Sequence, residues 1–451
     1  MTTSRTEELK KRSLKHIFHC HGRVPEISLI LEKGKGIMVT DTDGKEYMDL
    51  CSFYGCSSLG YCNDEIIDTA YKAMKQMSFN STNVPYSSIP AIEYSETLAK
   101  FVPKNITRFQ FCSGGSESVE TAIKTIKAYW YIKGKASKYK VLCTADAFHG
   151  SFYLTGTLMG NPIGRNYFGP EAPGVVRVPH YHCHRCPFHL KYPDCGVWCA
   201  HYLEKIIVDE EGADSIAAFI AEPMHSWAGG EPVPEYFPIV REILTKHDIL
   251  FIDDETVTGF CRTGKNFGID HWNVQPDLMI MGKGMIGGYF PFAGVGISEE
   301  VYSVFPGTTI ITGLTNTGNA VGCAIAKAVL DIYIRDNMVE HVAKVGNHVK
   351  ERLEKEFRPL PHVANVAGLG LNRSIELIAD KETKRRFPEN VQVIDHIIKQ
   401  CRAKGLFVRS FSTFGNMEQV FFMPPLIITQ EQVDSALDRL YSILSGLKDL
   451  R

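Results

Sequence analysis

The chain of 451 residues is long enough to bury a large core and to form two or three domains. Its composition is that of an ordinary globular protein, with 44% hydrophobic residues, 22% charged residues and a formal net charge of -2. This balance argues against a nucleic-acid-binding surface, and no apolar run approaches the roughly 20 residues that span a bilayer.

The N-terminal residues, from Met1 to Arg12, are polar and contain neither an apolar segment nor a small-residue cleavage site. We therefore expect no secretory signal, and we place the protein in the cytoplasm. In a long chain of this kind, the 13 cysteines are more typical of reduced thiols than of a disulfide framework.

Residues 113–117 read Ser-Gly-Gly-Ser-Glu and come directly before a predicted helix over residues 116–130, whose buried face carries Val119, Ala122, Ile123 and Ile126. Glycines let backbone amides approach an anion, and a helix N-terminus adds positive potential. The segment is therefore a candidate phosphate cradle, although glycine-rich turns before helices are common.

Phe148, His149 and Gly150 follow a predicted strand over residues 141–143. The carboxyl ends of parallel strands usually form a ligand crevice, which favours a binding role for this segment. The alternative is a core phenylalanine beside a loop histidine.

A group of four cysteines lies in the middle of the chain, at Cys183, Cys186, Cys195 and Cys199, with several histidines nearby. Two close pairs resemble a zinc site, but the gap between the pairs is shorter than in a usual zinc ribbon. The spacing of Cys195 and Cys199 also suits one face of a helix, so both interpretations stay open.

Continuous apolar runs at residues 217–221, 249–252 and 278–281 predict buried parallel strands covered by helices on both faces. Asp253, Asp254 and Glu255 end the second of these runs; carboxylates there can pair with a cationic group or bind magnesium. Lys283 and a glycine-rich turn follow the third. A desolvated amine at such a position suits a Schiff-base enzyme, whereas the simpler interpretation is the start of a surface loop.

The C-terminal third reads as a smaller α+β unit. Pro424 and Pro425 can end a strand but cannot lie inside a central one. Thr429 and Gln432 form a capping-box pattern before a run of leucines at helical spacing, which predicts a docked terminal helix.

Several motifs occur together in this sequence: the 254–264 segment, the Gly-Lys-Gly at 282–284, the cradle at 113–117, Glu222 before Pro223, and Thr315. Together they resemble the signature of class III aminotransferases, which are pyridoxal-phosphate enzymes of fold type I. The interval between Asp254 and Lys283 is 283 − 254 = 29 positions, which matches the family. The resemblance implies an α/β fold. A large domain, over residues 66–334, would hold a mainly parallel seven-stranded sheet between helices, and a small α+β domain would combine residues 1–65 and 335–451.

Carried over residue by residue, the resemblance makes Lys283 the residue that binds pyridoxal 5'-phosphate covalently and then moves the substrate proton. Asp254 would pair with the pyridine nitrogen and keep the ring cationic. Phe148 would stack on the ring, while Gly115 and Ser116 would hold the phosphate. The resemblance adds four further contacts with the cofactor: His149, Glu222, Thr256 and Val257.

Thr315 matches a residue that reaches the phosphate of the neighbouring subunit, which implies a homodimer with shared active sites, or a tetramer. Thr256 stands where the family usually has valine or isoleucine. It either adds a hydrogen bond near the cofactor or preserves β-branched bulk.

Arg409 matches the family arginine that pairs with a substrate carboxylate, a role that suits its planar fork. Trp227 stands where some relatives carry a glutamate that sequesters this arginine. Phe53, Tyr54 and Trp227 are candidate pocket residues, with ordinary core packing as the alternative.

We therefore expect an aminotransferase that moves an amino group from an ω-amino acid, an amine or an amino acid to a keto acid such as pyruvate. The resemblance implies a ping-pong reaction through pyridoxamine phosphate. The same cofactor residues also support an amino-acid racemase or epimerase, so that reaction remains the alternative.

Overall fold

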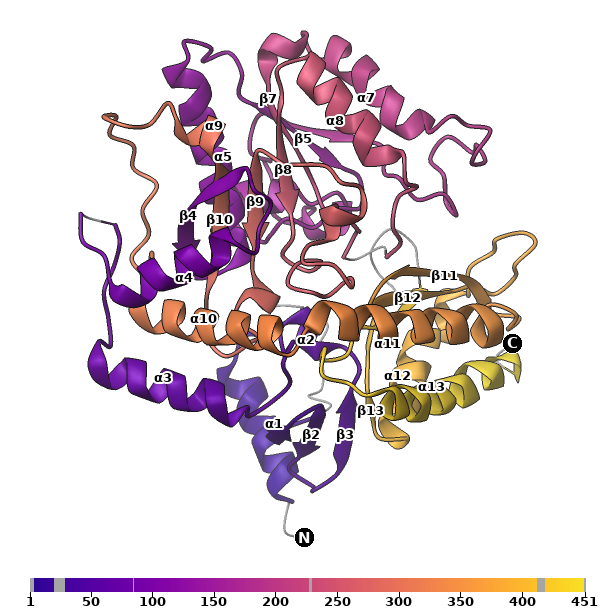
Figure 1. The fold of residues 1–451 in the computed structure, drawn as a ribbon. Helices are drawn as coiled ribbons and strands as arrows, with labels where there is room; N and C mark the ends of the chain where they lie inside the picture. The colour runs from indigo at the N-terminus through magenta and orange to yellow at the C-terminus, as the bar shows by residue number, and fades with distance from the viewer. Residues whose placement is uncertain (1–3, 20–28, 84, 227–228, 412–417, 450–451) are drawn as a thin grey trace.

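A computed structural model describes residues 4–19, 29–83, 85–226, 229–411 and 418–449. The described chain forms three sheets, one of seven strands and two of four, with helices packed around them (Figure 1). Within these ranges, no helix is both long enough and apolar enough to cross a membrane.

The seven-stranded sheet forms the centre of the large unit and is mainly parallel, as expected. Only β10 runs against its neighbours, because it pairs antiparallel with both β4 and β9. In spatial order, the strands are β4 (Ile106–Cys112), β10 (Ala293–Ser298), β9 (Leu278–Met281), β8 (Leu250–Asp254), β7 (Ile216–Ala221), β5 (Lys140–Thr144) and β6 (Val175–Val178).

Helices cover both faces of this sheet, which explains why its strands read as continuous apolar runs. Ile220 and Ile252 pack in one apolar cluster with the buried face of α5 (Gly115–Ile132). The adjacent residues Phe219 and Phe251 point to the other face and pack in a cluster that includes α8 (Tyr236–Lys246). The predicted helix at 116–130 is confirmed with slightly wider bounds.

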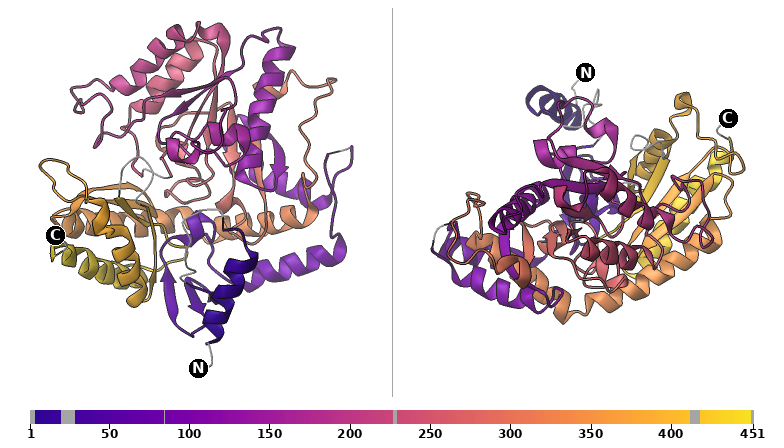
Figure 2. Two further views of the ribbon diagram at one scale, coloured as in Figure 1. Left: turned by 180° about the vertical axis from the view of Figure 1, so that it is seen from behind. Right: turned by 90° about the horizontal axis from the view of Figure 1, so that it is seen from above.

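The remaining helices of the large unit frame the sheet (Figures 1 and 2). The long helix α10 packs against α3 and α4 along one side. The bounds are α3 (Asp64–Gln76), α4 (Ile89–Ala99), α6 (Tyr153–Thr157), α7 (Trp198–Asp209), α9 (Glu299–Tyr302) and α10 (Ala320–Arg335).

A second region combines the two ends of the chain. Its first sheet has the order β1-β2-β3-β13, in which β13 (Leu406–Phe407) pairs in parallel with β3 (Glu46–Asp49) although more than 350 positions separate them. Its second sheet has the order β11-β12-β15-β14 and is antiparallel throughout. This agrees with the expected α+β part built from both termini, while the boundaries at residues 65 and 334 remain predictions.

The other elements of this region are α1 (Arg5–His16), β1 (Leu31–Lys35), β2 (Met38–Asp41), α2 (Ser52–Gly55), α11 (Met338–Arg352), β11 (Val363–Leu369), β12 (Asn372–Leu377), α12 (Val393–Ala403), β14 (Arg409–Phe411), β15 (Glu418–Phe422) and α13 (Gln430–Ser445).

The predicted C-terminal elements are confirmed. Thr429 Oγ1 accepts a hydrogen bond from Gln432 N (3.3 Å), and Gln432 Oε1 accepts one from Thr429 N (3.0 Å), which is the capping box at the start of α13. Strand β15 ends at Phe422, before the two prolines.

Candidate active site

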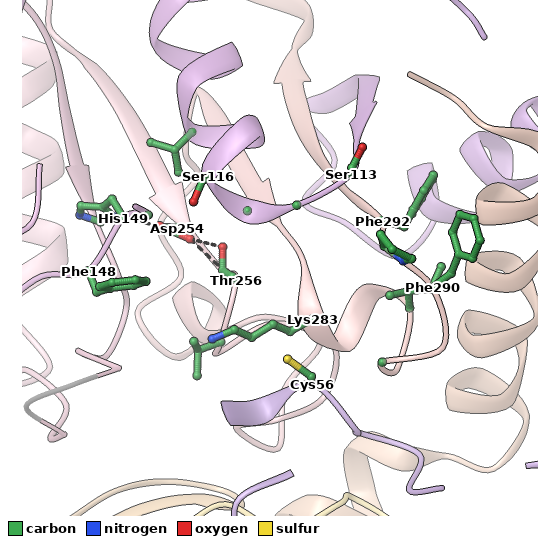
Figure 3. Close-up of a pocket in the computed structure, with 18 of the residues that line it drawn as sticks. Cys56, Ser113, Ser116, Phe148, His149, Asp254, Thr256, Lys283, Phe290 and Phe292 are labelled. Carbon is green, nitrogen blue, oxygen red and sulfur yellow. Dashed lines mark hydrogen bonds and ion pairs between the residues drawn. The ribbon is translucent and has the colours of Figure 1, made fainter. Parts of the chain in front are cut away.

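A cavity of about 490 Å³ opens at the carboxyl ends of the parallel strands. The loops after β5, β7, β8 and β9 meet there because neighbouring parallel strands end at the same edge of a sheet. Nine of the residues singled out from the sequence line this cavity (Figure 3): Gly115, Ser116, Phe148, His149, Glu222, Asp254, Thr256, Val257 and Lys283.

Lys283 follows β9 and extends its side chain across the cavity, between Thr256 and Cys56 (Figure 3). Its backbone φ of +45° lies in the left-handed region, which is uncommon for a residue with a side chain and is typical of functional sites. Burial lowers the pKa of the Lys283 amine, and the nearby positive charge of Arg409 lowers it further. A lower pKa raises the fraction of neutral amine, the form that attacks a carbonyl carbon.

Asp254 ends β8 and is 3% exposed. His149 Nδ1 donates to its Oδ2 (2.8 Å), while Thr256 N (3.1 Å) and Thr256 Oγ1 (2.5 Å) donate to its Oδ1. Three donors therefore fix the carboxylate with both oxygens engaged. Thr256 thus adds a hydrogen bond at this site, as well as its β-branched bulk.

Glu222 fixes the loop that carries Phe148. Its two carboxylate oxygens accept hydrogen bonds from Phe148 N and Ser226 N, each at 3.0 Å. Burial raises the pKa of Glu222, and the negative charge of Asp254 acts in the same direction. Phe148 then stands at the edge of the cavity opposite the Lys283 amine (Figure 3).

The candidate phosphate cradle lies at the N-terminus of α5. Gly114 is the N-cap, and no side chain caps the helix at this position. Ser116 Oγ accepts a hydrogen bond from Ser151 N (3.1 Å). Position 150, next to Ser116, requires glycine, because its φ is +125° and a Cβ there would lie 2.6 Å from Ser116 Oγ. Backbone amides and a helix N-terminus thus face the cavity, a favourable place for an anion.

The family model described as aminotransferase class-III matches residues 20–444. The chain belongs to this family. It is 31% identical to the diaminobutyrate–2-oxoglutarate transaminase of Halomonas elongata, over 100% of this chain and 98% of that protein.

Two solved structures are similar to the enzyme throughout. One is a thermostable (S)-enantioselective omega-transaminase from Thermomicrobium roseum, with a TM-score of 0.93, 32% identity and coverage of 99% of this chain and 100% of that one. The other is the omega transaminase of Pseudomonas jessenii in complex with PMP, with a TM-score of 0.91, 28% identity and coverage of 98% and 99%.

Class III aminotransferases use pyridoxal phosphate, and the residues of this enzyme fit that cofactor. The uncapped N-terminus of α5 suits its phosphate, the oriented carboxylate of Asp254 suits a cationic ring nitrogen, and the Lys283 amine enters the same cavity. The three groups approach one 490 Å³ space from different elements.

Four of the candidate residues, Phe53, Tyr54, Thr315 and Arg409, are not among those that line the cavity. Phe53 packs on Phe407, with 5.1 Å between ring centroids, in agreement with the core-packing alternative for this residue. Tyr54 lies beside the buried Arg409, whose guanidinium carbon is 4.7 Å from the centre of the tyrosine ring. Thr315 is exposed, in the segment before α10. Trp227 lies outside the described residues.

Sequence reasoning missed several residues of the cavity wall. They are Cys56, Ile286 and the run from Gly288 to Phe292. The aromatic and proline residues of that run directly follow the glycine-rich turn after Lys283, so their position in the sequence could have predicted that they lie near the cavity. Cys56 directly follows α2, far away in the sequence, and no local pattern indicated it.

Cys195 and Cys199 do not share a helix face. Helix α7 begins at Trp198, so Cys199 lies in it while Cys195 precedes it. In the described part of the chain, no group of three or more His, Cys, Asp or Glu side chains is arranged to hold a metal ion. The zinc interpretation therefore has no support from these residues.

Proposed function

We propose that the enzyme transfers an amino group from an ω-amino acid, an amine or an amino acid to a keto acid such as pyruvate, in two half-reactions of ping-pong order. The observation that carries this proposal is the convergence of Lys283, Asp254 and the α5 N-terminus on one cavity. Family membership supports amino transfer, and the cavity supplies the place for it.

In this proposal, each residue around the cofactor has a different role. Pyridoxal phosphate, when bound, supplies an electron sink for the carbanion that forms when the substrate loses its proton. Lys283 would hold the cofactor through Nζ and, once released, carry the proton at that atom. Asp254 would keep the ring nitrogen cationic, with His149 and Thr256 holding its oxygens in place. Phe148 would pack on the ring face.

Arg409 is the proposed carboxylate-binding residue. It lies in β14, is buried, and lies close enough to Lys283 to lower the pKa of that amine. A guanidinium offers paired N–H groups that match a carboxylate. The Halomonas relative is named for diaminobutyrate and 2-oxoglutarate, both of which carry carboxylates.

We propose a homodimer in which Thr315 reaches the active site of the neighbouring subunit. Thr315 is exposed and lies outside the cavity of its own chain. Large apolar side chains are exposed on α3 and α4: Ile67, Tyr71, Met74, Ile89 and Ile92. Exposed apolar side chains gathered on neighbouring helices are typical of a subunit interface. Sedimentation of the holoenzyme tests this, and a monomer at catalytic concentrations would contradict it.

Single-turnover experiments test the reaction. Holoenzyme incubated with one amino donor and no keto acid should release one equivalent of keto product per site, and then stop until pyruvate is added. Initial rates with both substrates varied should give parallel lines in a double-reciprocal plot. Continuous inversion of the α-carbon, with no keto product, would instead indicate the racemase alternative.

Arg409→Ala tests the proposed substrate contact. Its kcat/KM should fall roughly 10- to 100-fold for 4-aminobutyrate, because a charge-assisted pair of hydrogen bonds is lost. The value for benzylamine should change much less, since this donor has no carboxylate. An equal loss for both donors would indicate a structural role for the arginine.

A further inference from the structure

The segment that precedes Cys56 has an unusual backbone. Ser52, Phe53 and Tyr54 have φ values of 47°, 44° and 64°, and Gly55 follows at 81°. Only glycine adopts this left-handed region without steric cost, so three successive residues with side chains make α2 a strained turn. Such strain persists only where the surroundings enforce it, and it is found mainly at functional sites.

Several contacts hold this turn in place. Asp49 Oδ1 accepts hydrogen bonds from Cys51 N (2.8 Å) and Ser52 N (2.9 Å). Ser52 Oγ donates to Met423 O (2.8 Å), directly after β15. The Phe53 ring packs on Phe407 of β13, two positions before Arg409. The turn is therefore fixed to the same part of the fold that carries the arginine.

The turn presents the Tyr54 ring to the guanidinium of Arg409. The guanidinium carbon lies 4.7 Å from the centre of the Tyr54 ring and 5.1 Å from that of Phe421. Arg409 is 6% exposed, whereas Tyr54 is 42% exposed. Although burial lowers the pKa of Arg409 to about 10, the side chain still carries its charge at neutral pH. A cation held against aromatic rings gains roughly 2- to 30-fold in an equilibrium constant for each such contact.

We propose that Tyr54 is a specificity-determining residue, which holds Arg409 in position and so favours substrates with a carboxylate over amines without one. This inference rests on the proposed role of Arg409. A carboxylate gains from a guanidinium that is already in place, because less rotamer freedom is lost on binding. A donor without a carboxylate brings apolar atoms against a buried cation, which is unfavourable unless the arginine moves away from both rings.

Three variants of the holoenzyme separate this role from a structural one. Tyr54→Leu removes the aromatic ring, and Tyr54→Phe keeps it. Phe53→Leu removes the neighbouring ring of the same turn; the Phe53 ring packs on Phe407 and not on Arg409. The measured quantity is the ratio of kcat/KM for 4-aminobutyrate to that for benzylamine, with pyruvate as the acceptor. Inhibition by glutarate reports carboxylate binding without turnover.

We expect Tyr54→Leu to lower the ratio roughly 3- to 10-fold and to weaken glutarate inhibition by a similar factor, the range of a lost cation–π contact. Tyr54→Phe should keep the ratio within about twofold of the wild type, since the ring face remains. Phe53→Leu should lower the melting temperature but change the ratio much less than Tyr54→Leu does, because the Asp49 and Ser52 hydrogen bonds still hold the turn. A ratio that stays constant in Tyr54→Leu, or that shifts equally in Phe53→Leu, would overturn the inference.

The double variant distinguishes this inference from the proposed function. If Tyr54 acts through Arg409, Tyr54→Leu should produce no further change in the ratio when Arg409 is already alanine. If Arg409→Ala by itself leaves carboxylate donors unaffected, the proposed arginine contact is wrong. If Arg409→Ala impairs them while Tyr54→Leu does not, only the role of Tyr54 is wrong.

Discussion

Thr256→Val removes one hydroxyl at the centre of the site and leaves the size of the side chain nearly unchanged. Thr256 Oγ1 makes the shortest of the three hydrogen bonds to Asp254, at 2.5 Å, and Thr256 N makes another at 3.1 Å to the same oxygen. The variant therefore removes one donor and keeps the backbone donor and the His149 bond.

The size of the effect follows from the burial of the acceptor. A hydrogen bond to a charged group is worth about 1.5–3 kcal/mol, and the loss is largest when no water replaces the donor. Asp254 is 3% exposed, so the full free energy of the hydrogen bond should be lost if no water takes the place of the hydroxyl. Thr256 borders the cavity, however, so a water molecule can replace part of that bond. We expect the lower end, about 1.5 kcal/mol, or roughly a 10-fold fall in kcat/KM.

Two assays and one matched variant check this expectation. Initial rates with a fixed donor and acceptor give kcat/KM, and titration of apoenzyme with pyridoxal phosphate gives the cofactor dissociation constant. Thr256→Ser keeps the hydroxyl but removes the methyl group. In the wild type this methyl group lies close to Gly115, since a Cβ added at that glycine would be 3.3 Å from it. If the valine variant matches the wild type within twofold, or if the serine variant loses as much as valine, the hydroxyl is not what supports Asp254.

Three further predictions concern other parts of the chain. Lys283→Ala should lower kcat by a factor on the order of 10³ or more while the melting temperature stays near that of the wild type, and substantial turnover would remove Lys283 from its proposed role. Thr315→Ala should weaken pyridoxal phosphate binding about fivefold without changing the sedimentation coefficient, since one hydrogen bond of about 1 kcal/mol to the partner's cofactor would be lost; unchanged affinity would contradict this contact. Asp253→Asn should stabilise the enzyme increasingly as the pH rises, because burial and the adjacent Glu255 raise the pKa of Asp253 well above 3.8. A group whose folded pKa is raised costs stability from its unfolded pKa upward, at no more than about 1.4 kcal/mol per pH unit, so the melting-temperature gap between variant and wild type should widen as the pH rises above about 4. A constant gap would show that Asp253 titrates normally.

Much of the architecture was predictable because the large sheet is buried on both faces. Strands such as β7 and β9 are buried at every position, and each reads as a continuous apolar run in the sequence. The α5 helix was equally clear, because its apolar positions recur at helical spacing. The antiparallel insertion of β10 between β4 and β9 was not predictable, since strand order depends on pairing between distant segments.

The cofactor-facing residues were predictable for a different reason. Lys283 and the 113–117 cradle each directly adjoin a recognisable strand or helix, so position in the chain implied position in the crevice. Cys56 and Tyr54 lacked that advantage. Cys56 reaches the cavity wall directly after the left-handed turn of α2, and Tyr54 reaches Arg409 within that turn. Residues with side chains rarely adopt such a backbone, so no local propensity predicts it.

At the end of β8, the sequence alone does not show which of two aspartates faces the cavity, whereas the structure does. Asp253 and Asp254 are adjacent and both are buried, so by residue type alone either could be the carboxylate of the site. Successive strand residues point to opposite faces, so only one of them can face the cavity. In the described structure, Asp254 faces the cavity and receives three donors, whereas no donor reaches either oxygen of Asp253, which lies beside Glu255. The alternation of the strand thus leaves one aspartate ready to pair with a cation, while burial raises the pKa of its neighbour. Changing Asp253 should therefore affect stability, and changing the partners of Asp254 should affect catalysis.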